Sequence, residues 1–130
     1  MSDLEVEVVG LPSDAPAAAE LQHLCALALA SASVHDGHVA IEFVTEERIR
    51  QLNREHRQLD EPTDVLSFEI DGAEPSPGPR ELGDIVICPG RTADIREAVV
   101  HGALHLTGMD HETDHGEMLA LQRELLNWMP

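Results

Sequence analysis

The chain has 130 residues, 25 of them acidic and 8 basic, and its formal net charge is -17. This length suits a single domain, residues 1–130, and the hydrophobic content of 42% is too high for an acidic disordered tail. The charge argues against nonspecific coating of DNA, because that mode of binding depends on clustered Lys and Arg that release counterions. A role with nucleic acid must therefore depend on a local basic patch.

Features of membrane and secreted proteins are missing from the sequence. The longest apolar stretch is far shorter than the ~20 residues that span a bilayer, and residues 1–10 do not resemble a signal peptide. Cys25 and Cys88 lie far apart and outside any CxxC pair, so we expect buried, reduced thiols. These patterns predict a cytoplasmic protein with no membrane partner.

The chain opens with a strand–helix–strand pattern. Residues 4–9 (LEVEVV) alternate apolar and acidic side chains, as a half-buried strand does. Residues 17–32 are predicted to form a helix with one apolar stripe, and residues 39–44 (VAIEFV) a second strand.

A second helix is predicted from residue 46 to about residue 58. Thr45 is a suitable N-cap, and two glutamates follow it in the first turn, where carboxylates favour the helix dipole. Its spacing predicts that Ile49, Leu52 and Leu59 point inward.

Two strands and two helices are predicted in the second half. The strands are residues 65–70 and 82–88, separated by a Pro/Gly-rich loop, and the helices are residues 93–107 and 114–129. Four strands and about four helices indicate a small α+β or α/β sandwich whose strand order the sequence leaves open.

Three histidines fall within one short segment, His101-GAL-His105-LTGMD-His111. Residues four apart lie one above the other on a helix, so His101 and His105 could converge on one cation. Gly108 could then end the helix and bring His111 toward the same ion. Three neutral nitrogens with an open fourth position are typical of catalytic zinc. The spacing therefore predicts a metal site.

The pattern resembles the HExxH motif of zinc proteases but lacks its general base. Gly102 stands where those enzymes have a glutamate, so a protease is a poor interpretation. His115 follows on the apolar side of the last predicted helix, and we expect it to pack beside the site rather than to bind metal. Asp94 and Glu97 are expected to be exposed carboxylates of the first helical turn.

At these motifs the sequence resembles the YbeY family of bacterial endoribonucleases and ribosomal RNA maturation factors. HGALHLTGMDHE is similar to the family's histidine signature. Two further blocks follow the family's order, LN through Arg57 with PTDVLSF, and LGDIVI.

The resemblance implies specific roles for residues and partners. It implies that His101, His105 and His111 bind one zinc ion, and that Arg57 is the basic residue important for RNA cleavage. It implies an α+β fold with a mixed four-stranded sheet and a metal-site helix facing a cleft. It also implies cleavage of single-stranded RNA during 3′-end maturation of small-subunit ribosomal RNA and in ribosome quality control. The implied partners are ribosomal RNA, the small subunit and a ribosome-associated GTPase.

Two departures from the family pattern are visible. The segment between Cys88 and His101 is about ten residues shorter than usual, and Met109 replaces an aromatic residue. The ligands remain, but the wall of the cleft is expected to change.

The chemistry can also be considered without the family. Hydrolysis of a phosphodiester needs a nucleophile, a Lewis acid and charge neutralisation; zinc can lower the pKa of water to ~7, and Arg pairs with phosphate oxygens. Arg50, Arg54 and Arg57 form a stripe opposite the apolar face, and spacing alone favours ordinary surface pairing, such as Glu46 with Arg50. The family resemblance reverses this interpretation for Arg57 only. No general base is evident.

Two aspartates in the matching blocks bear on the missing base. Asp64 and Asp84, at the predicted strand starts, are expected to be turn or cap groups. We therefore predict a single-zinc endoribonuclease. The alternatives are a ribosome-assembly factor with a structural metal and little cleavage activity, and a zinc hydrolase of peptides or small molecules.

Overall fold

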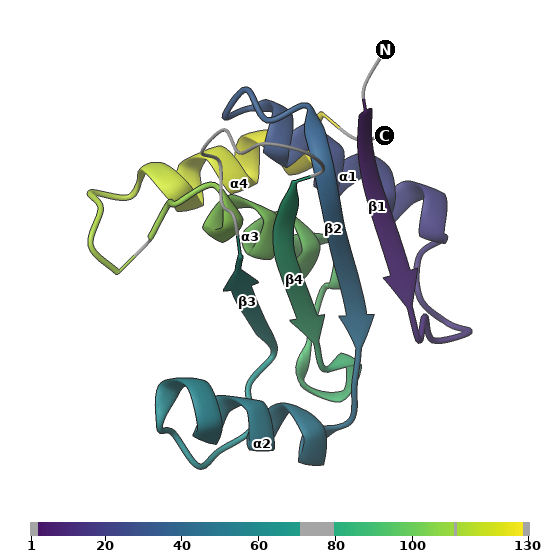
Figure 1. Ribbon diagram of the computed structural model, residues 1–130, viewed down its shortest axis with the longest axis vertical. Coiled ribbons are helices and arrows are strands. Elements are labelled where there is room, and N and C mark those ends of the chain that lie inside the picture. The colour runs from purple at the N-terminus through teal and green to yellow at the C-terminus, as the bar shows by residue number, and fades with distance from the viewer. Residues whose placement is uncertain (1–2, 71–79, 111, 129–130) are drawn as a thin grey trace.

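The computed structural model describes residues 3–70, 80–110 and 112–128. It contains a mixed four-stranded sheet in the order β1-β2-β4-β3, with helices α1, α3 and α4 on one face and α2 at one end (Figure 1). This α+β architecture confirms the predicted fold class. The elements are β1 (Asp3–Val9), α1 (Ala18–Ala30), β2 (Asp36–Phe43), α2 (Glu46–Arg57), β3 (Val65–Glu69), β4 (Glu81–Ile87), the 3-10 turn η1 (Pro89–Arg91), α3 (Ile95–Leu106) and α4 (Glu117–Asn127).

The strand order places β3 at one edge of the sheet, beside the histidine-containing helix α3. The β1–β2 and β2–β4 pairs are parallel, whereas β3 is antiparallel to β4, with Val65 opposite Ile87. β3 is therefore an edge strand. α3 packs against both β3 and β4, so the histidine helix lies beside this edge.

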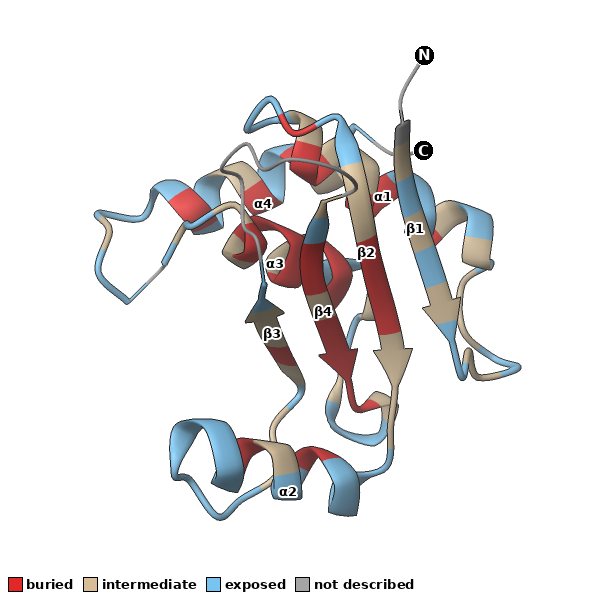
Figure 2. Cartoon of the chain, in the orientation of Figure 1, coloured by how far each residue is buried: buried red, intermediate tan, exposed pale blue. Residues whose placement is uncertain are grey.

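The main core lies between the sheet and helices α1, α3 and α4. In β2, Val39 and Ile41 point into it, while the intervening Ala40 belongs to the opposite face, as strand alternation requires. Figure 2 shows buried residues along β2, β4, α1 and α3. A smaller buried cluster occupies the other face beneath α2 and contains Ile49, Leu66, Val86 and Cys88.

The ends of α2 show one correct prediction and one wrong one. Thr45 caps the helix, since its hydroxyl accepts a hydrogen bond from the Arg48 N–H at 3.1 Å. At the other end, Gln58 adopts a left-handed conformation with φ 60°, which turns the chain away from the helix axis. Leu59 is therefore 42% exposed, and the prediction that it points inward is wrong.

α4 begins three residues later than predicted. Gly116 is left-handed, with φ 98°, and the Asp114 carboxylate accepts hydrogen bonds from the N–H groups of Gly116 and Met118. The Asp114 side chain thus orders the turn before the helix. Most of the predicted Pro/Gly-rich loop, residues 71–79, and the predicted end of the last helix lie outside the described residues.

Candidate active site

α3 holds its histidines close to the sheet because Gly102 lacks a side chain. A Cβ atom at Gly102 would lie 2.5 Å from Cγ2 of Ile85 and 3.1 Å from the Ser67 hydroxyl oxygen. That hydroxyl donates a hydrogen bond to the Gly102 carbonyl at 3.0 Å and ties β3 to α3. Position 102 therefore faces the sheet, and the glutamate of the protease motif would have no room here.

The two helical histidines face each other through their outer ring nitrogens. The Nε2 atoms of His101 and His105 are 3.2 Å apart. On the inner side, Nδ1 of His101 is 2.8 Å from Oε1 of Gln122, and Nδ1 of His105 is 2.9 Å from the Met109 carbonyl oxygen. Each ring is thus held at its Nδ1 atom, and the two Nε2 atoms face each other.

This arrangement determines where the ring protons lie. Carbonyl oxygens only accept hydrogen bonds, so both Nδ1 atoms carry hydrogen, and in neutral rings both Nε2 atoms present lone pairs. Two lone pairs 3.2 Å apart repel each other unless a proton or a cation lies near both. A metal-binding histidine commonly donates its other N–H to a carbonyl or carboxylate, as both rings do here. His101 and His105 therefore fit a divalent metal ion.

The predicted ligand set is described only in part. His111, the third predicted ligand, lies outside the described residues. Within the described residues, no group of three His, Cys, Asp or Glu side chains is arranged to hold a metal. The two predicted helical ligands, His101 and His105, therefore lie together, and metal binding by all three histidines stays a prediction.

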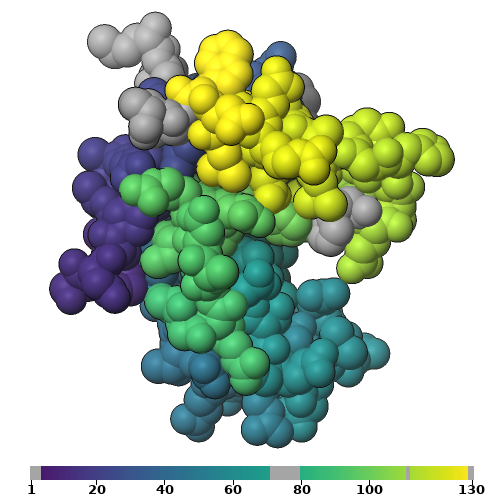
Figure 3. Space-filling view, turned by 180° about the vertical axis from the view of Figure 1, so that it is seen from behind, coloured from purple at the N-terminus to yellow at the C-terminus, as the bar shows by residue number. Residues whose placement is uncertain are grey.

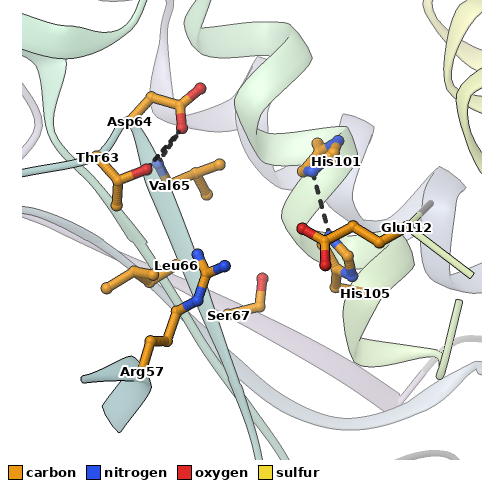
Figure 4. Close-up of a pocket in the computed structure, with 9 residues that line it drawn as sticks. All are labelled: Arg57, Thr63, Asp64, Val65, Leu66, Ser67, His101, His105 and Glu112. Atoms are coloured by element: carbon orange, nitrogen blue, oxygen red, sulfur yellow. Dashed lines mark hydrogen bonds between the residues drawn. The ribbon is translucent and has the colours of Figure 1, made fainter. Parts of the chain in front are cut away.

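A pocket of about 420 Å³ opens in front of the two histidines. Its walls come from the end of α2, the start of β3, α3 and the segment before α4 (Figure 4). The lining residues are Arg57, Thr63, Asp64, Val65, Leu66, Ser67, His101, His105 and Glu112. One cavity thus joins two histidines, an arginine and two carboxylates.

Arg57 reaches this pocket from the last turn of α2 (Figure 4). Among the three arginines of the predicted stripe, it is the one that lines the pocket. Arg50 instead pairs with Asp60 at 2.9 Å, so the predicted partner Glu46 is wrong. Glu46 lies 3.5 Å from Arg91.

The carboxylates are divided between the two faces of the sheet. Asp64 accepts a hydrogen bond from the Val65 N–H at 2.8 Å, which confirms the expected turn role, and it also lines the pocket. Asp84 lies inside β4, not at its start, and on the opposite face. Burial, followed by the nearby Glu81 carboxylate, raises the pKa of Asp84.

Sequence reasoning missed two residues and misplaced a third. Gln122 is 5% exposed, and its contact partner His101 lies 21 residues away in the sequence. No local sequence motif therefore indicates this contact. Glu112 follows the histidine motif directly, a position that could have signalled a pocket carboxylate. His115 is exposed in the turn before α4 and lines neither this pocket nor the one beside it, so the prediction that it packs beside the site is wrong.

The described helices do not include a membrane-spanning candidate. The longest, α1, has 13 residues, and none is both long and apolar enough to cross a bilayer.

Comparison with known proteins identifies relatives over most of the chain. Residues 11–129 match the family model described as endoribonuclease YbeY. The endoribonuclease YbeY of Rubrobacter xylanophilus is 46% identical over 93 residues, which cover 69% of this chain and 66% of the relative. That of Stutzerimonas stutzeri is 44% identical over 126 residues, covering 86% and 78%, respectively. That of Bacillus cereus strain B4264 is 40% identical over 119 residues, covering 72% and 74%.

A solved structure has a similar fold. The solution structure of TM1509 from Thermotoga maritima aligns with a TM-score of 0.53 and 26% sequence identity, covering 94% of this chain and 87% of that one. The similarity of fold and the sequence matches therefore point to the same family. This chain belongs to the endoribonuclease YbeY family.

Proposed function

We propose that the protein is a zinc-dependent endoribonuclease that cleaves single-stranded RNA. It acts in the cytoplasm in 3′-end maturation of small-subunit ribosomal RNA and in ribosome quality control. The family and the names of the relatives support the nuclease activity. The observation that carries the proposal is the convergence of Nε2 of His101 and His105 in one pocket with Arg57.

His101, His105 and His111 are the residues that would hold one zinc ion per chain. When bound, zinc supplies Lewis acidity and lowers the pKa of water to about 7. The neutral tautomers of His101 and His105, fixed at Nδ1, suit this role.

The other pocket residues can supply charge neutralisation and a proton acceptor. Arg57 offers a planar guanidinium that pairs with phosphate oxygens and offsets negative charge at the reacting phosphorus. Glu112 and Asp64 are carboxylates within the same pocket and can accept a proton from an attacking hydroxyl. Asp64 is already held by the Val65 N–H, which leaves Glu112 as the less constrained of the two.

The net charge of -17 favours guided rather than independent binding of RNA. An acidic surface repels phosphates, so affinity for arbitrary RNA is weak. We infer that the small ribosomal subunit, together with a ribosome-associated GTPase, presents the single-stranded substrate. Four of the eight arginines lie between Arg48 and Arg57, which concentrates positive charge near the pocket.

Cleavage of a labelled single-stranded RNA by zinc-loaded protein tests the proposal. We expect Arg57→Ala and His105→Ala each to lower the rate by about 100-fold or more, as loss of one charge-stabilising group does. Arg54→Ala is the matched control, because Arg54 lies one turn earlier on α2 but does not line the pocket. If both pocket variants cut RNA as fast as the parent, the activity belongs to a contaminant. That result would favour the alternative of a ribosome-assembly factor with little cleavage activity.

A further inference from the structure

A second pocket of about 200 Å³ adjoins the first one behind His101. It lies where the segment after η1, the first turns of α3 and the middle of α4 meet the start of β3. Both pockets are lined by Asp64, Val65 and His101, so these residues stand between them. Figure 3 shows α3 and α4 side by side on this side of the molecule.

The donor in this second pocket is the amide of Gln122. The side chain is 5% exposed, and its Oε1 atom accepts the hydrogen bond from His101. Its Nε2 amino group makes no hydrogen bond to another side chain or to the backbone in the described part of the chain, and the side chain lines the pocket. The amino group thus offers N–H donors to this cavity, and a ligand that fills it can supply the oxygen or nitrogen acceptor.

The acceptors are carboxylates on the other walls. Glu97 of α3 is exposed and lines the pocket, as do Asp64 and Asp94. Asp94 already accepts hydrogen bonds from the N–H groups of the first helical turn, which leaves Glu97 as the freer acceptor on α3. Apolar contact comes from Val65, Ala98 and Leu119, the last of which is 41% exposed. Acceptors, one donor and an apolar wall are the groups that bind a small planar heterocycle, whereas the carboxylates would repel a phosphate.

We propose that this pocket is a nucleobase subsite that selects bases with an exocyclic amino group. The inference rests on the proposed function, which places a phosphodiester at His101 and His105. Glu97 accepts from the amino group of the base, and Gln122 donates to its ring nitrogen or carbonyl. Cytosine, adenine and guanine carry both groups. Uracil lacks the amino group, and its ring N3–H lies between two carbonyl oxygens that the carboxylate repels, so uracil is disfavoured.

The two pockets together orient the RNA. The phosphate occupies the pocket with Arg57, because the second pocket is acidic, and the neighbouring base turns into the second pocket past His101. Single-stranded RNA permits this, since its unstacked bases can splay out and be read along their Watson–Crick edges.

Binding of two short RNA strands tests the subsite. One strand contains uridine only, and the other has one central cytidine; fluorescence anisotropy with EDTA present measures their affinities without cleavage. We expect the cytidine strand to bind about fivefold more tightly to the parent, as one favourable base contact provides. Glu97→Ala should abolish this preference. Glu124→Ala should keep it, because Glu124 is an exposed carboxylate of α4 outside both pockets.

Two results would overturn the subsite. One is equal affinity of the parent for both strands, and the other is a preference that survives in Glu97→Ala. Cleavage by zinc-loaded protein without any base preference would remove the subsite and leave the proposed nuclease. A base preference that depends on Glu97, without any cleavage, would support the subsite and contradict the proposed nuclease.

Discussion

His101 donates a hydrogen bond from Nδ1 to Oε1 of Gln122 over 2.8 Å, and this contact joins α3 to α4. The acceptor comes from a buried side chain 21 residues farther along the chain. It keeps the Nε2 lone pair of His101 directed toward His105. Gln122 is therefore a positioning residue for the predicted metal ligand.

Replacement of Gln122 by methionine should weaken zinc binding about 10- to 100-fold, as loss of a hydrogen bond behind a metal ligand commonly does. Methionine is unbranched and fills similar space but offers no strong acceptor. Gln122→Glu keeps an acceptor oxygen and should bind zinc at least as tightly as the parent. Competition with a chromophoric chelator measures these affinities. Equal affinity of the parent and Gln122→Met would show that the contact has no positioning role.

Gly102→Ala should destabilise the protein although alanine is the better helix former. The substitution gains about 1 kcal/mol in helix propensity, but overpacking against Ile85 costs about 1–3 kcal/mol. The shift of α3 should also slow RNA cleavage. Urea unfolding followed by circular dichroism measures the stability difference.

Gly90→Ala is the control for this substitution. The nearest atom to its added Cβ is Oε1 of the flexible Glu46 side chain, at 3.3 Å. We expect the free energy of unfolding of Gly90→Ala to differ from that of the parent by no more than about 0.5 kcal/mol, as at ordinary surface positions. An equal effect at both glycines would contradict the proposed close packing of α3 on the sheet.

His38 connects three strands on the sheet face opposite the site. Its Nε2 atom is 3.2 Å from Glu7 of β1, and its Nδ1 atom is 2.6 Å from Glu81 of β4. Partial burial lowers the pKa of His38, but attraction by Glu81, hydrogen bonds to Glu7 and Glu81, and the charge of Glu5 together outweigh it and raise the pKa. Asp84 also faces this cluster from β4.

The stability should therefore depend on pH through His38. A histidine whose pKa is higher in the folded state stabilises fully below the unfolded value of about 6.5, and this contribution is lost as pH rises through the folded pKa. The free energy of unfolding should fall over this window in the parent and fall less in His38→Gln. Urea titrations of both proteins at several pH values provide the comparison. If the free energies of unfolding of the parent and His38→Gln changed in parallel with pH, His38 would make no contribution to the pH dependence of stability.

Cys25 should be unreactive in the folded protein. Burial raises the pKa of its thiol to about 12, so almost no thiolate is present near neutral pH. A thiol reagent should modify it only after unfolding in urea, and mass spectrometry after proteolysis identifies the site. Rapid labelling of native protein at Cys25 would contradict the buried position.

The fold followed from sequence wherever local periodicity decided the structure. Alternation in residues 4–9 and 39–44 placed apolar side chains on the core face, and both strands formed as expected. Thr45 and the histidine helix were likewise predicted from short-range patterns, namely a capping hydroxyl and a four-residue spacing. These features depend on interactions within one or two turns of chain.

Features that depend on distant contacts were not predictable in the same way. The contact of Gln122 with His101 exists only after α3 and α4 pack together. Strand order, with β3 at the edge, arises from pairing between distant segments. Leu59 and His115 were misplaced because single left-handed residues, Gln58 and Gly116, redirect the chain next to them.

Zinc titration into metal-free protein tests the central claim most directly, with the rate of single-stranded RNA cleavage as the readout. We expect no cleavage without metal and a rate that rises until one zinc ion is bound per chain, then stays constant. Arg57→Ala should bind zinc with the same stoichiometry but cut far more slowly, because Arg57 lines the pocket without being a predicted ligand. Full cleavage by metal-free protein, or none by the zinc-loaded parent, would contradict the account.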